Sequence, residues 1–170
     1  MIVDLTSLEK SVLAFDLSFP PEAFDLESNE AKLKNAVEAR GKLTKRIVQV
    51  DVEGEISVTI EVECTRCLKP SEKKLHIAFK SEFVTAENFT AAKEAELQER
   101  DLDVTVYEGD EIDLTELVRE QILLNLPEQV FCVENCRGLC EKCGANRNLL
   151  DCNCIEKDVD PRWSALKSLK

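Results

Sequence analysis

The stretch "IVQVDVEGEISVTIEVECTRCLKPSEKKLHIAFK", residues 47–80, decides the fold. Apolar side chains alternate with polar ones over residues 48–52 and again over residues 56–62. A third segment follows at residues 75–79, where every second side chain is large and apolar. Strict alternation of this length predicts half-buried strands, and Gly54 predicts a turn between the first two. The stretch therefore predicts three strands of an antiparallel sheet.

Two cysteines lie between the second and third of these predicted strands. Cys64 and Cys67 stand in "CTRCLKPSEKK", which the flanking alternation places at the tip of a hairpin. A redox pair with this spacing would need a helix N-terminus in a βαβ unit to activate its thiolate. Antiparallel strands on both sides argue against thiol exchange, so we interpret the pair as part of a metal site.

Six more cysteines lie in "FCVENCRGLCEKCGANRNLLDCNC", residues 131–154. The chain has no apolar run of eighteen residues and no recognisable secretory leader, so we expect a cytoplasmic protein whose thiols stay reduced. Thiolates two positions apart in a tight turn can both face one Zn²⁺. We therefore predict one or two structural zinc ions. The predicted ligands are Cys64, Cys67, Cys132, Cys136, Cys140, Cys143, Cys152 and Cys154.

Eight thiolates suffice for two sites of four ligands each. Cys140, Cys143, Cys152 and Cys154 form a compact local set. The other four would then clip the hairpin tip to the segment after residue 127. Spacing alone leaves open an exchange of Cys136 with Cys140.

The segment "IDLTELVREQILLNLP", residues 112–127, is the strongest helix signal in the chain. Asp113 can act as N-cap, Glu116 has the spacing of a capping box, and Pro127 stops the helix. Its apolar face consists of Leu114, Leu117, Val118 and Ile122.

Three other segments carry weaker signals. Residues 28–41 are intermediate between helix and strand, and residues 86–101 are typical of a solvated helix or a linker. In the tail, Trp163 predicts an anchor that packs a short helical turn onto the protein.

Together these patterns predict an α+β fold. We expect an antiparallel β-sheet, one amphipathic helix and a Cys-rich, zinc-stapled C-terminal segment. Residues 1–130 would form the sheet domain with its Cys-x-x-Cys hairpin tip. Residues 131–170 would form the zinc-binding segment, with the tail packed on it.

Charge is distributed unevenly along this acidic chain, whose net charge is −12. Residues 81–120 hold thirteen acids against three bases, whereas residues 64–80 hold five bases and one acid. Residues 136–170 hold seven bases and five acids. The basic regions therefore coincide with the cysteines, and loops ordered by metal can present cations to RNA phosphates. The candidate RNA contacts are Arg66, Lys69, Lys73, Lys74, Arg137, Lys142 and Arg147.

No catalytic constellation is evident. His76 is the single histidine and falls on the polar face of its strand, so a nucleophile–histidine pair lacks support. The chain also lacks the glycine-rich motifs that cradle phosphates. We therefore expect a protein that is not an enzyme, with no small-molecule substrate and no membrane partner.

Four motifs occur in an order that resembles the bacterial YceD-type family of large ribosomal RNA subunit accumulation proteins. They are "CTRCLKP", "IDLTELVREQILLNLP", "CRGLCEKCGANRNLLDCNC" and "DPRWSALKSL". The resemblance runs from about residue 45 to the C-terminus. It implies that Cys64, Arg66 and Cys67 are the C-x-R-C motif of the family, and that residues 136–154 are a second cluster that some members lack.

The resemblance implies a non-enzymatic factor that supports accumulation of 23S rRNA and maturation of the large subunit. Its partner would be 23S rRNA or its precursor, with a large-subunit ribosomal protein as a further candidate. One alternative is a zinc-stabilised adaptor whose acidic stretch, residues 81–120, binds a basic ribosomal protein. A nuclease is the other alternative, and it lacks the clustered carboxylates or histidines that such chemistry needs.

Overall fold

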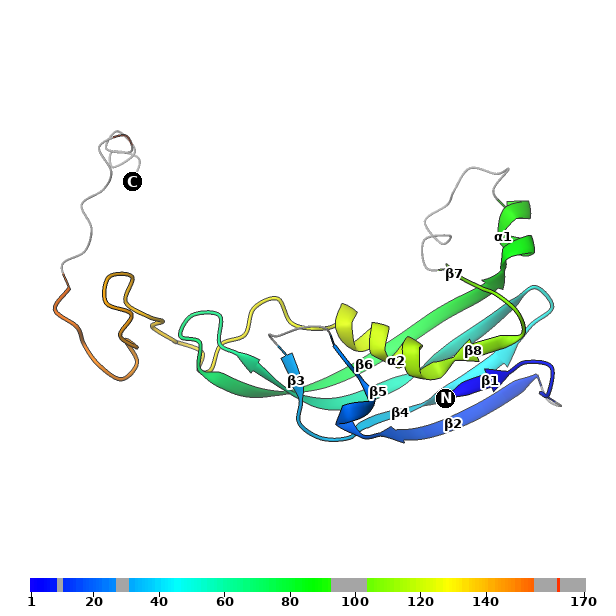
Figure 1. Ribbon diagram of the computed structural model, residues 1–170, viewed down its shortest axis with the longest axis horizontal. Coiled ribbons are helices and arrows are strands. Elements are labelled where there is room, and N and C mark those ends of the chain that lie inside the picture. The colour runs from blue at the N-terminus through cyan, green and yellow to red at the C-terminus, as the bar shows by residue number, and fades with distance from the viewer. Residues whose placement is uncertain (9–10, 27–30, 93–103, 155–161, 163–170) are drawn as a thin grey trace.

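The computed structural model describes residues 1–8, 11–26, 31–92, 104–154 and 162. A long, curved sheet of six strands dominates it (Figure 1). The strands lie in the order β2 (Val12–Phe19), β4 (Val37–Lys45), β5 (Gln49–Glu63), β6 (Pro70–Thr85) and β7 (Val104–Tyr107), with the short β3 (Ala31–Leu33) also paired with β5. Neighbours are antiparallel except β6 and β7, which are parallel.

The remaining elements surround this sheet. They are β1 (Ile2–Asp4), which pairs with β8 (Glu111–Asp113), the 3-10 turn η1 (Pro21–Ala23), and the helices α1 (Ala86–Ala92) and α2 (Leu114–Leu124). The fold is α+β, as the sequence predicts, although the sheet is mixed and there is a second, short helix. No helix within the described residues is long and apolar enough to cross a membrane.

The expected turn at Gly54 is wrong, because β5 continues through this residue. Gly54 lies directly opposite Gly41 of β4, and the two backbones approach closely. A Cβ on Gly41 would lie 2.2 Å from the carbonyl oxygen of Glu53 and 2.7 Å from the ring of Phe15. The glycines therefore permit close strand contact, which the sequence alone does not distinguish from a turn.

Residues 28–41, ambiguous in sequence, contribute strands where the structure describes them. The turn between β3 and β4 is attached to β5 by two backbone contacts at Thr59 and by the ion pair of Lys34 with Glu61 at 3.0 Å. The carbonyl oxygen of Thr59 accepts from the backbone N–H of Lys34 at 3.0 Å. The N–H of Thr59 donates to Oδ1 of Asn35 at 2.9 Å. Pairing with β5 outweighs the weak local preference for helix.

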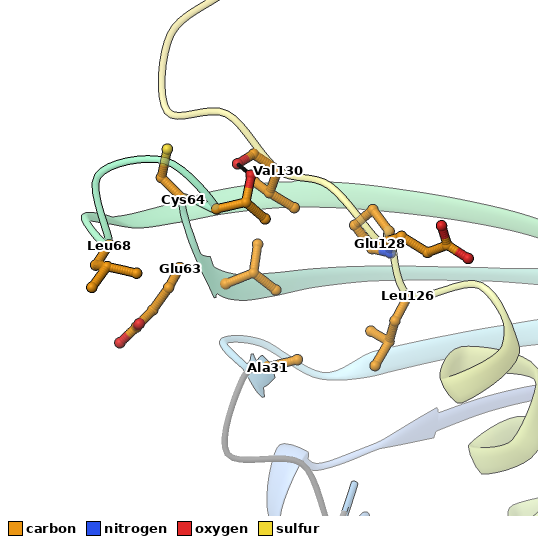
Figure 2. Close-up of a pocket in the computed structure, with 10 residues that line it drawn as sticks. Ala31, Glu63, Cys64, Leu68, Leu126, Glu128 and Val130 are labelled. Carbon is orange, nitrogen blue, oxygen red and sulfur yellow. Dashed lines mark hydrogen bonds between the residues drawn. The ribbon is translucent and has the colours of Figure 1, made fainter. Parts of the chain in front are cut away.

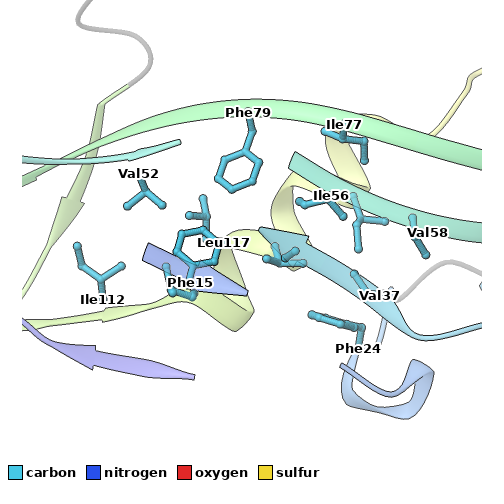
Figure 3. Close-up of a cluster of buried hydrophobic side chains, with 14 of the residues drawn as sticks. Phe15, Phe24, Val37, Val52, Ile56, Val58, Ile77, Phe79, Ile112 and Leu117 are labelled. Atoms are coloured by element: carbon cyan, nitrogen blue, oxygen red, sulfur yellow. The ribbon is translucent and has the colours of Figure 1, made fainter. Parts of the chain in front are cut away.

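The main core lies between one face of the sheet and α2 (Figure 3). Alternating residues of β5 point into it, as predicted, and so do Ile77 and Phe79 of β6. The predicted apolar face of α2 is buried in full: Leu114, Leu117, Val118 and Ile122 are at most 4% exposed. This core ends before the tip of the β5–β6 hairpin.

Capping of α2 agrees with the sequence at one residue and differs at another. Asp113 is the N-cap, and its carboxylate accepts from the backbone N–H of Thr115 at 2.8 Å. Glu116 instead pairs with Arg119 at 2.9 Å. The helix ends at Leu124, before Pro127. Of the segment 86–101, expected to be a solvated helix or a linker, the first seven residues form α1, whereas residues 93–103 and Trp163 lie outside the described part of the chain.

We expect Gly41→Ala to lower the free energy of unfolding by about 1–3 kcal/mol, because the added methyl group overlaps a backbone oxygen that cannot move away. Urea denaturation followed by circular dichroism measures this change. Glu55→Ala, at an exposed position of the paired strand, is the matched control and should change stability by less than about 0.5 kcal/mol. Equal effects of the two substitutions would show that the strands do not approach closely here.

Candidate metal centres

Four cysteines from two distant segments form the buried thiol cluster. Cys64 and Cys67 lie in the turn between β5 and β6, and Cys132 and Cys136 follow α2. Their sulfur atoms all lie within 4.8 Å of one another. The Sγ atoms of Cys64 and Cys136 are 3.7 Å apart, and those of Cys67 and Cys132 are 3.5 Å apart. Cys64, Cys67 and Cys136 are at most 5% exposed.

The other four cysteines form the surface thiol cluster. The sulfur atoms of Cys140, Cys143, Cys152 and Cys154 also lie within 4.8 Å of one another. Cys143 is exposed, and Cys140 and Cys152 are half-buried. The structure therefore groups the thiols in the simpler of the two ways that the spacing leaves open, with Cys136 in the buried cluster.

The two Cys-x-x-Cys turns have the same backbone construction. In each, the N–H of the residue after the second cysteine donates to the carbonyl of the first, from Leu68 to Cys64 and from Gly144 to Cys140, both at 2.9 Å. Both donating residues are left-handed, with φ of 59° at Leu68 and 71° at Gly144. The repeated geometry indicates that both turns serve the same purpose.

Ionisation in the buried cluster is uneven. Burial opposes ionisation of Cys64, but backbone N–H groups, that of Cys132 first, lower its pKa to about 6. Hydrogen bonding with the Cys67 sulfur, together with burial, raises the pKa of Cys132 to about 12. Cys64 therefore loses its proton easily, whereas Cys132 keeps its proton because neighbouring thiolates disfavour a further negative charge.

The surface cluster shows the same division. Backbone N–H groups of Cys143 and Lys142 lower the pKa of Cys140 to about 6. Hydrogen bonds with Cys143 and Cys140 raise the pKa of Cys154 to about 12. A bound divalent cation removes the repulsion that keeps the last thiol protonated.

Both clusters fit tetrahedral zinc by donor set and spacing. With zinc–sulfur bonds of 2.3 Å, sulfur atoms in a tetrahedral site lie about 3.8 Å apart. In the buried cluster, the Cys67–Cys132 and Cys64–Cys136 sulfur–sulfur distances of 3.5 and 3.7 Å are close to this value. A disulfide would require about 2.05 Å, and all eight cysteines are free thiols. The clusters can therefore bind metal ions, and zinc matches their chemistry.

Backbone contacts attach the segment after α2 to the hairpin tip. The N–H of Thr65 donates to the carbonyl of Val130 at 2.8 Å, and the N–H of Leu139 donates to the carbonyl of Arg66 at 3.0 Å. The guanidinium of Arg66 donates to the carbonyl of Cys136 at 2.9 Å and lies 4.3 Å from the ring centroid of Phe131. Arg66 thus joins the two segments that supply the buried thiols.

The other candidate RNA contacts lie around the clusters. Lys69, Lys74, Lys142 and Arg147 are exposed, and Lys73 is half-buried. Arg137 is exposed and pairs with Asp151 at 2.8 Å. The structure thus leaves most of these cations at the surface beside the thiols.

Two pockets flank the buried cluster. One of about 280 Å³ lies between β3, the end of β5 and the segment after α2, and its charged lining residues are Glu63 and Glu128 (Figure 2). The other lies against β6, and its charged lining residues are Lys73, Lys74 and Glu134, with Phe131 beside them. Phosphate groups suit the second pocket better than the first, because two lysines outnumber one carboxylate in the second and the first has only carboxylates as charged groups.

Sequence reasoning missed Phe131 and Asn148. Phe131 supports the Arg66 guanidinium. The side-chain amide of Asn148 donates to the sulfur of Cys136 at 3.3 Å. Neither residue belongs to a recognisable ligand pattern, so the sequence contains no signal for these contacts.

Comparison with known proteins identifies relatives. A family model described as "Large ribosomal RNA subunit accumulation protein YceD" matches residues 52–170. The uncharacterized protein YlbN of Bacillus subtilis is 27% identical over 169 residues, covering 99% of this chain and 94% of that protein. No solved structure matches this chain.

Two plant proteins are also similar, both named large ribosomal RNA subunit accumulation protein YCED homolog 1, chloroplastic. The Arabidopsis thaliana protein is 33% identical over 60 residues, covering 35% of this chain and 19% of that protein. The Zea mays protein is 25% identical over 187 aligned positions, covering 92% of this chain and 60% of that protein. The chain thus spans less than two thirds of either plant relative.

We expect purified protein to contain two equivalents of zinc, and chelation to release the segment 127–154 from the sheet. Structural zinc stabilises small isolated domains by about 10–16 kcal/mol, and no large apolar core replaces it here. Hydrogen exchange should show lost protection at the N–H groups of Thr65, Leu68 and Leu139. The central part of β5 should remain protected by the main core. Unchanged exchange after complete metal removal would mean that the metal does not hold these segments together.

Substitution of the left-handed residue should affect the two turns differently. Gly144→Ala should lower the free energy of unfolding by about 1 kcal/mol, because a left-handed backbone disfavours a Cβ. Leu68→Gly should change it by less than about 1 kcal/mol, since relief of that strain offsets the added freedom of the unfolded chain. Thermal unfolding of the zinc-loaded variants measures both. Equal losses at the two positions would contradict the shared turn geometry.

Proposed function

The chain belongs to the YceD family of large ribosomal RNA subunit accumulation proteins, and from this premise we propose that it is a non-enzymatic ribosome-biogenesis factor. In this proposal it contacts 23S rRNA or its precursor directly and supports maturation of the large subunit. The observation that carries the proposal is the gathering of exposed cations around the two thiol clusters. The two clusters lie at one end of the long sheet, away from α1 and β7 (Figure 1).

Zinc would order the RNA-binding end of the protein. Cys64, Cys67, Cys132 and Cys136 would bind one ion, and Cys140, Cys143, Cys152 and Cys154 the other. Bound zinc supplies a fixed crosslink between segments that are far apart in sequence, and it does no redox chemistry. The cations on these loops are then held at defined positions, which lowers the entropy lost on binding RNA.

The seven proposed RNA contacts are exposed except for the half-buried Lys73, and they differ in the contacts that they already make within the protein. Lys142 and Arg147, on the surface cluster, and Lys69 and Lys74, at the hairpin tip, have exposed positions suited to phosphates. Arg66 already contacts Cys136 and Phe131. We propose that Arg66 both orders this surface and contacts RNA. We also propose that the groove lined by Lys73, Lys74 and Phe131 binds the phosphate backbone and one base of the RNA.

We propose two structural units with different sources of stability. Residues 1–130 form the sheet unit, whose core needs no metal, and residues 131–170 form the zinc unit that docks on the hairpin tip. The backbone contact between Thr65 and Val130 lies at the boundary. We assign this protein a cytoplasmic location, where ribosomal RNA is processed.

We assign no catalytic role to any residue. His76 lies 3.1 Å from the hydroxyl of Ser57, an arrangement that resembles a nucleophile–base pair. Both residues sit on the outer face of the sheet, where His76 is exposed, and an open face of this kind neither excludes water nor positions an oxyanion. A role in binding rather than in chemistry is therefore proposed.

Crosslinking in growing cells tests the contact. Ultraviolet irradiation, recovery of the protein under denaturing conditions and sequencing of attached RNA should yield reads concentrated in one part of 23S rRNA or its precursor. Enrichment of ribosomal proteins without RNA enrichment over an untagged control would contradict direct contact. It would favour an adaptor that uses the acidic stretch, residues 81–120.

Charge reversal then identifies the RNA-binding surface. Lys142→Glu with Arg147→Glu should weaken binding to the crosslinked RNA fragment and reduce the slope of log K against log[salt] by about 1.4–1.8 if two phosphate contacts are lost. Arg40→Glu with Lys42→Glu makes the same change of charge on β4, away from the thiols, and should leave the slope nearly unchanged. Equal effects of the two pairs would indicate a nonspecific dependence on net charge.

A further inference from the structure

We propose that the two metal centres are thermodynamically coupled, and that Asn148 is the positioning residue that links them. The inference rests on the proposal that both clusters bind metal, but not on RNA binding. It assigns to Asn148 a role that neither its spacing nor its residue type indicates.

A short hairpin of residues 136–148 spans both clusters. Leu139 and Asn146 form an antiparallel bridge. The N–H of Cys140 donates to the carbonyl of Ala145 at 2.8 Å, and the N–H of Arg147 donates to the carbonyl of Gly138 at 2.9 Å. One thiol of the buried cluster, Cys136, lies at the base of this hairpin, and the Cys140–Cys143 turn of the surface cluster forms its tip. A single small element therefore carries ligands of both centres.

The side chain of Asn148 is held in one orientation at the base of this hairpin. Its Oδ1 accepts from the backbone N–H of Arg137 at 2.8 Å, and its Nδ2 donates to the sulfur of Cys136 at 3.3 Å. Because the N–H of Arg137 can only donate, Oδ1 must face it and the amide nitrogen must face the sulfur. The Nδ2 group and the backbone N–H of Asn148 also donate to Oδ1 of Asn146, at 2.8 and 2.9 Å.

Metal at the surface cluster would hold this arrangement in place. Asn148 lies on the loop that joins Cys143 to Cys152, so binding of an ion by these cysteines restricts the loop at both ends. A second connection runs beside it, where Arg137 pairs with Asp151 at 2.8 Å. These residues directly follow Cys136 and precede Cys152. Metal binding at the surface centre would therefore stabilise two contacts near Cys136, that of Asn148 with the Cys136 sulfur and that of Asp151 with Arg137.

Donation of an N–H to a metal-bound thiolate stabilises its negative charge and fixes its direction. Removal of such supporting contacts around metal ligands costs about 10- to 100-fold in metal affinity. Occupancy of the surface centre should thus raise the affinity of the buried centre. By linkage, occupancy of the buried centre must raise the affinity of the surface centre by the same factor.

A double-mutant cycle on the full chain tests the coupling. Cys143→Ser disables the surface centre, and Asn148→Asp replaces the donor by an acceptor of the same shape. Zn²⁺ affinity of the buried centre is measured by chelator competition in the parent, each variant and the combination. Each single change should lower that affinity by about tenfold or more, and the combination should lower it little further. Additive losses, or an unchanged affinity in Asn148→Asp, would overturn the role of Asn148.

Cadmium NMR provides a readout that general destabilisation does not change. Each Cd²⁺-loaded Cys₄ centre gives its own resonance, and the Cys143→Ser variant assigns them. Asn148→Asp should shift the resonance of the buried centre while both centres are saturated. Asn135→Asp, an equal change of charge at the exposed residue before Cys136, should leave this resonance and the Zn²⁺ affinity within twofold of the parent. An equal shift in both variants would show that the added charge alone causes it, and this would overturn the proposal.

The outcomes separate this inference from the proposed function. If the protein binds two ions independently, the metal centres are supported and the coupling is refuted. If the ions are coupled but the protein does not crosslink to RNA, the coupling is supported and direct RNA contact is refuted. Failure to bind two ions would remove the premise of both the metal centres and their linkage.

Discussion

The meeting of thiols from distant parts of the chain is the constraint on which the functional end of this protein depends. Cys64 and Cys136 are 72 residues apart in sequence, yet their sulfur atoms lie 3.7 Å apart. Four thiolates at such distances repel one another, and a divalent cation converts the repulsion into a crosslink. The course of the chain after α2 follows from this contact. So does the placement of the cations that we propose to bind RNA.

The protein thus combines two kinds of stability. Under α2 the sheet buries a continuous apolar core, and this core accounts for the order of the central strands. At the hairpin tip, apolar packing among the described residues is limited to the buried side chains of Cys64, Cys67 and Cys136, with Cys132 and Leu139 packed against them. Such a small cluster cannot offset the entropy of ordering the following loops. The end that we propose to bind RNA would therefore be folded only with metal bound, whereas the sheet would persist without it.

Particular residues show where sequence reasoning succeeded and why it stopped. Alternation located β5 and β6, because one face of each strand must be apolar to cover the core. The same reasoning misread Gly54, since a glycine needed for close strand contact and a glycine needed for a turn look alike in sequence. Residues 28–41 have little local preference, and pairing with β5 decides their conformation where the structure describes them. Long-range pairing of this kind leaves no periodic trace.

By itself the sequence determined the α+β class, the capped apolar helix, the hairpin tip and the identity of the eight thiols, because each depends on local periodicity or on residue chemistry. Only the tertiary structure decided that Cys136 joins the buried cluster rather than the surface one. It also turned Arg66 towards Phe131 and the Cys136 carbonyl, and placed the Asn148 amide against the Cys136 sulfur. These outcomes depend on the distances between segments that only the folded sheet brings together, and no local pattern encodes them.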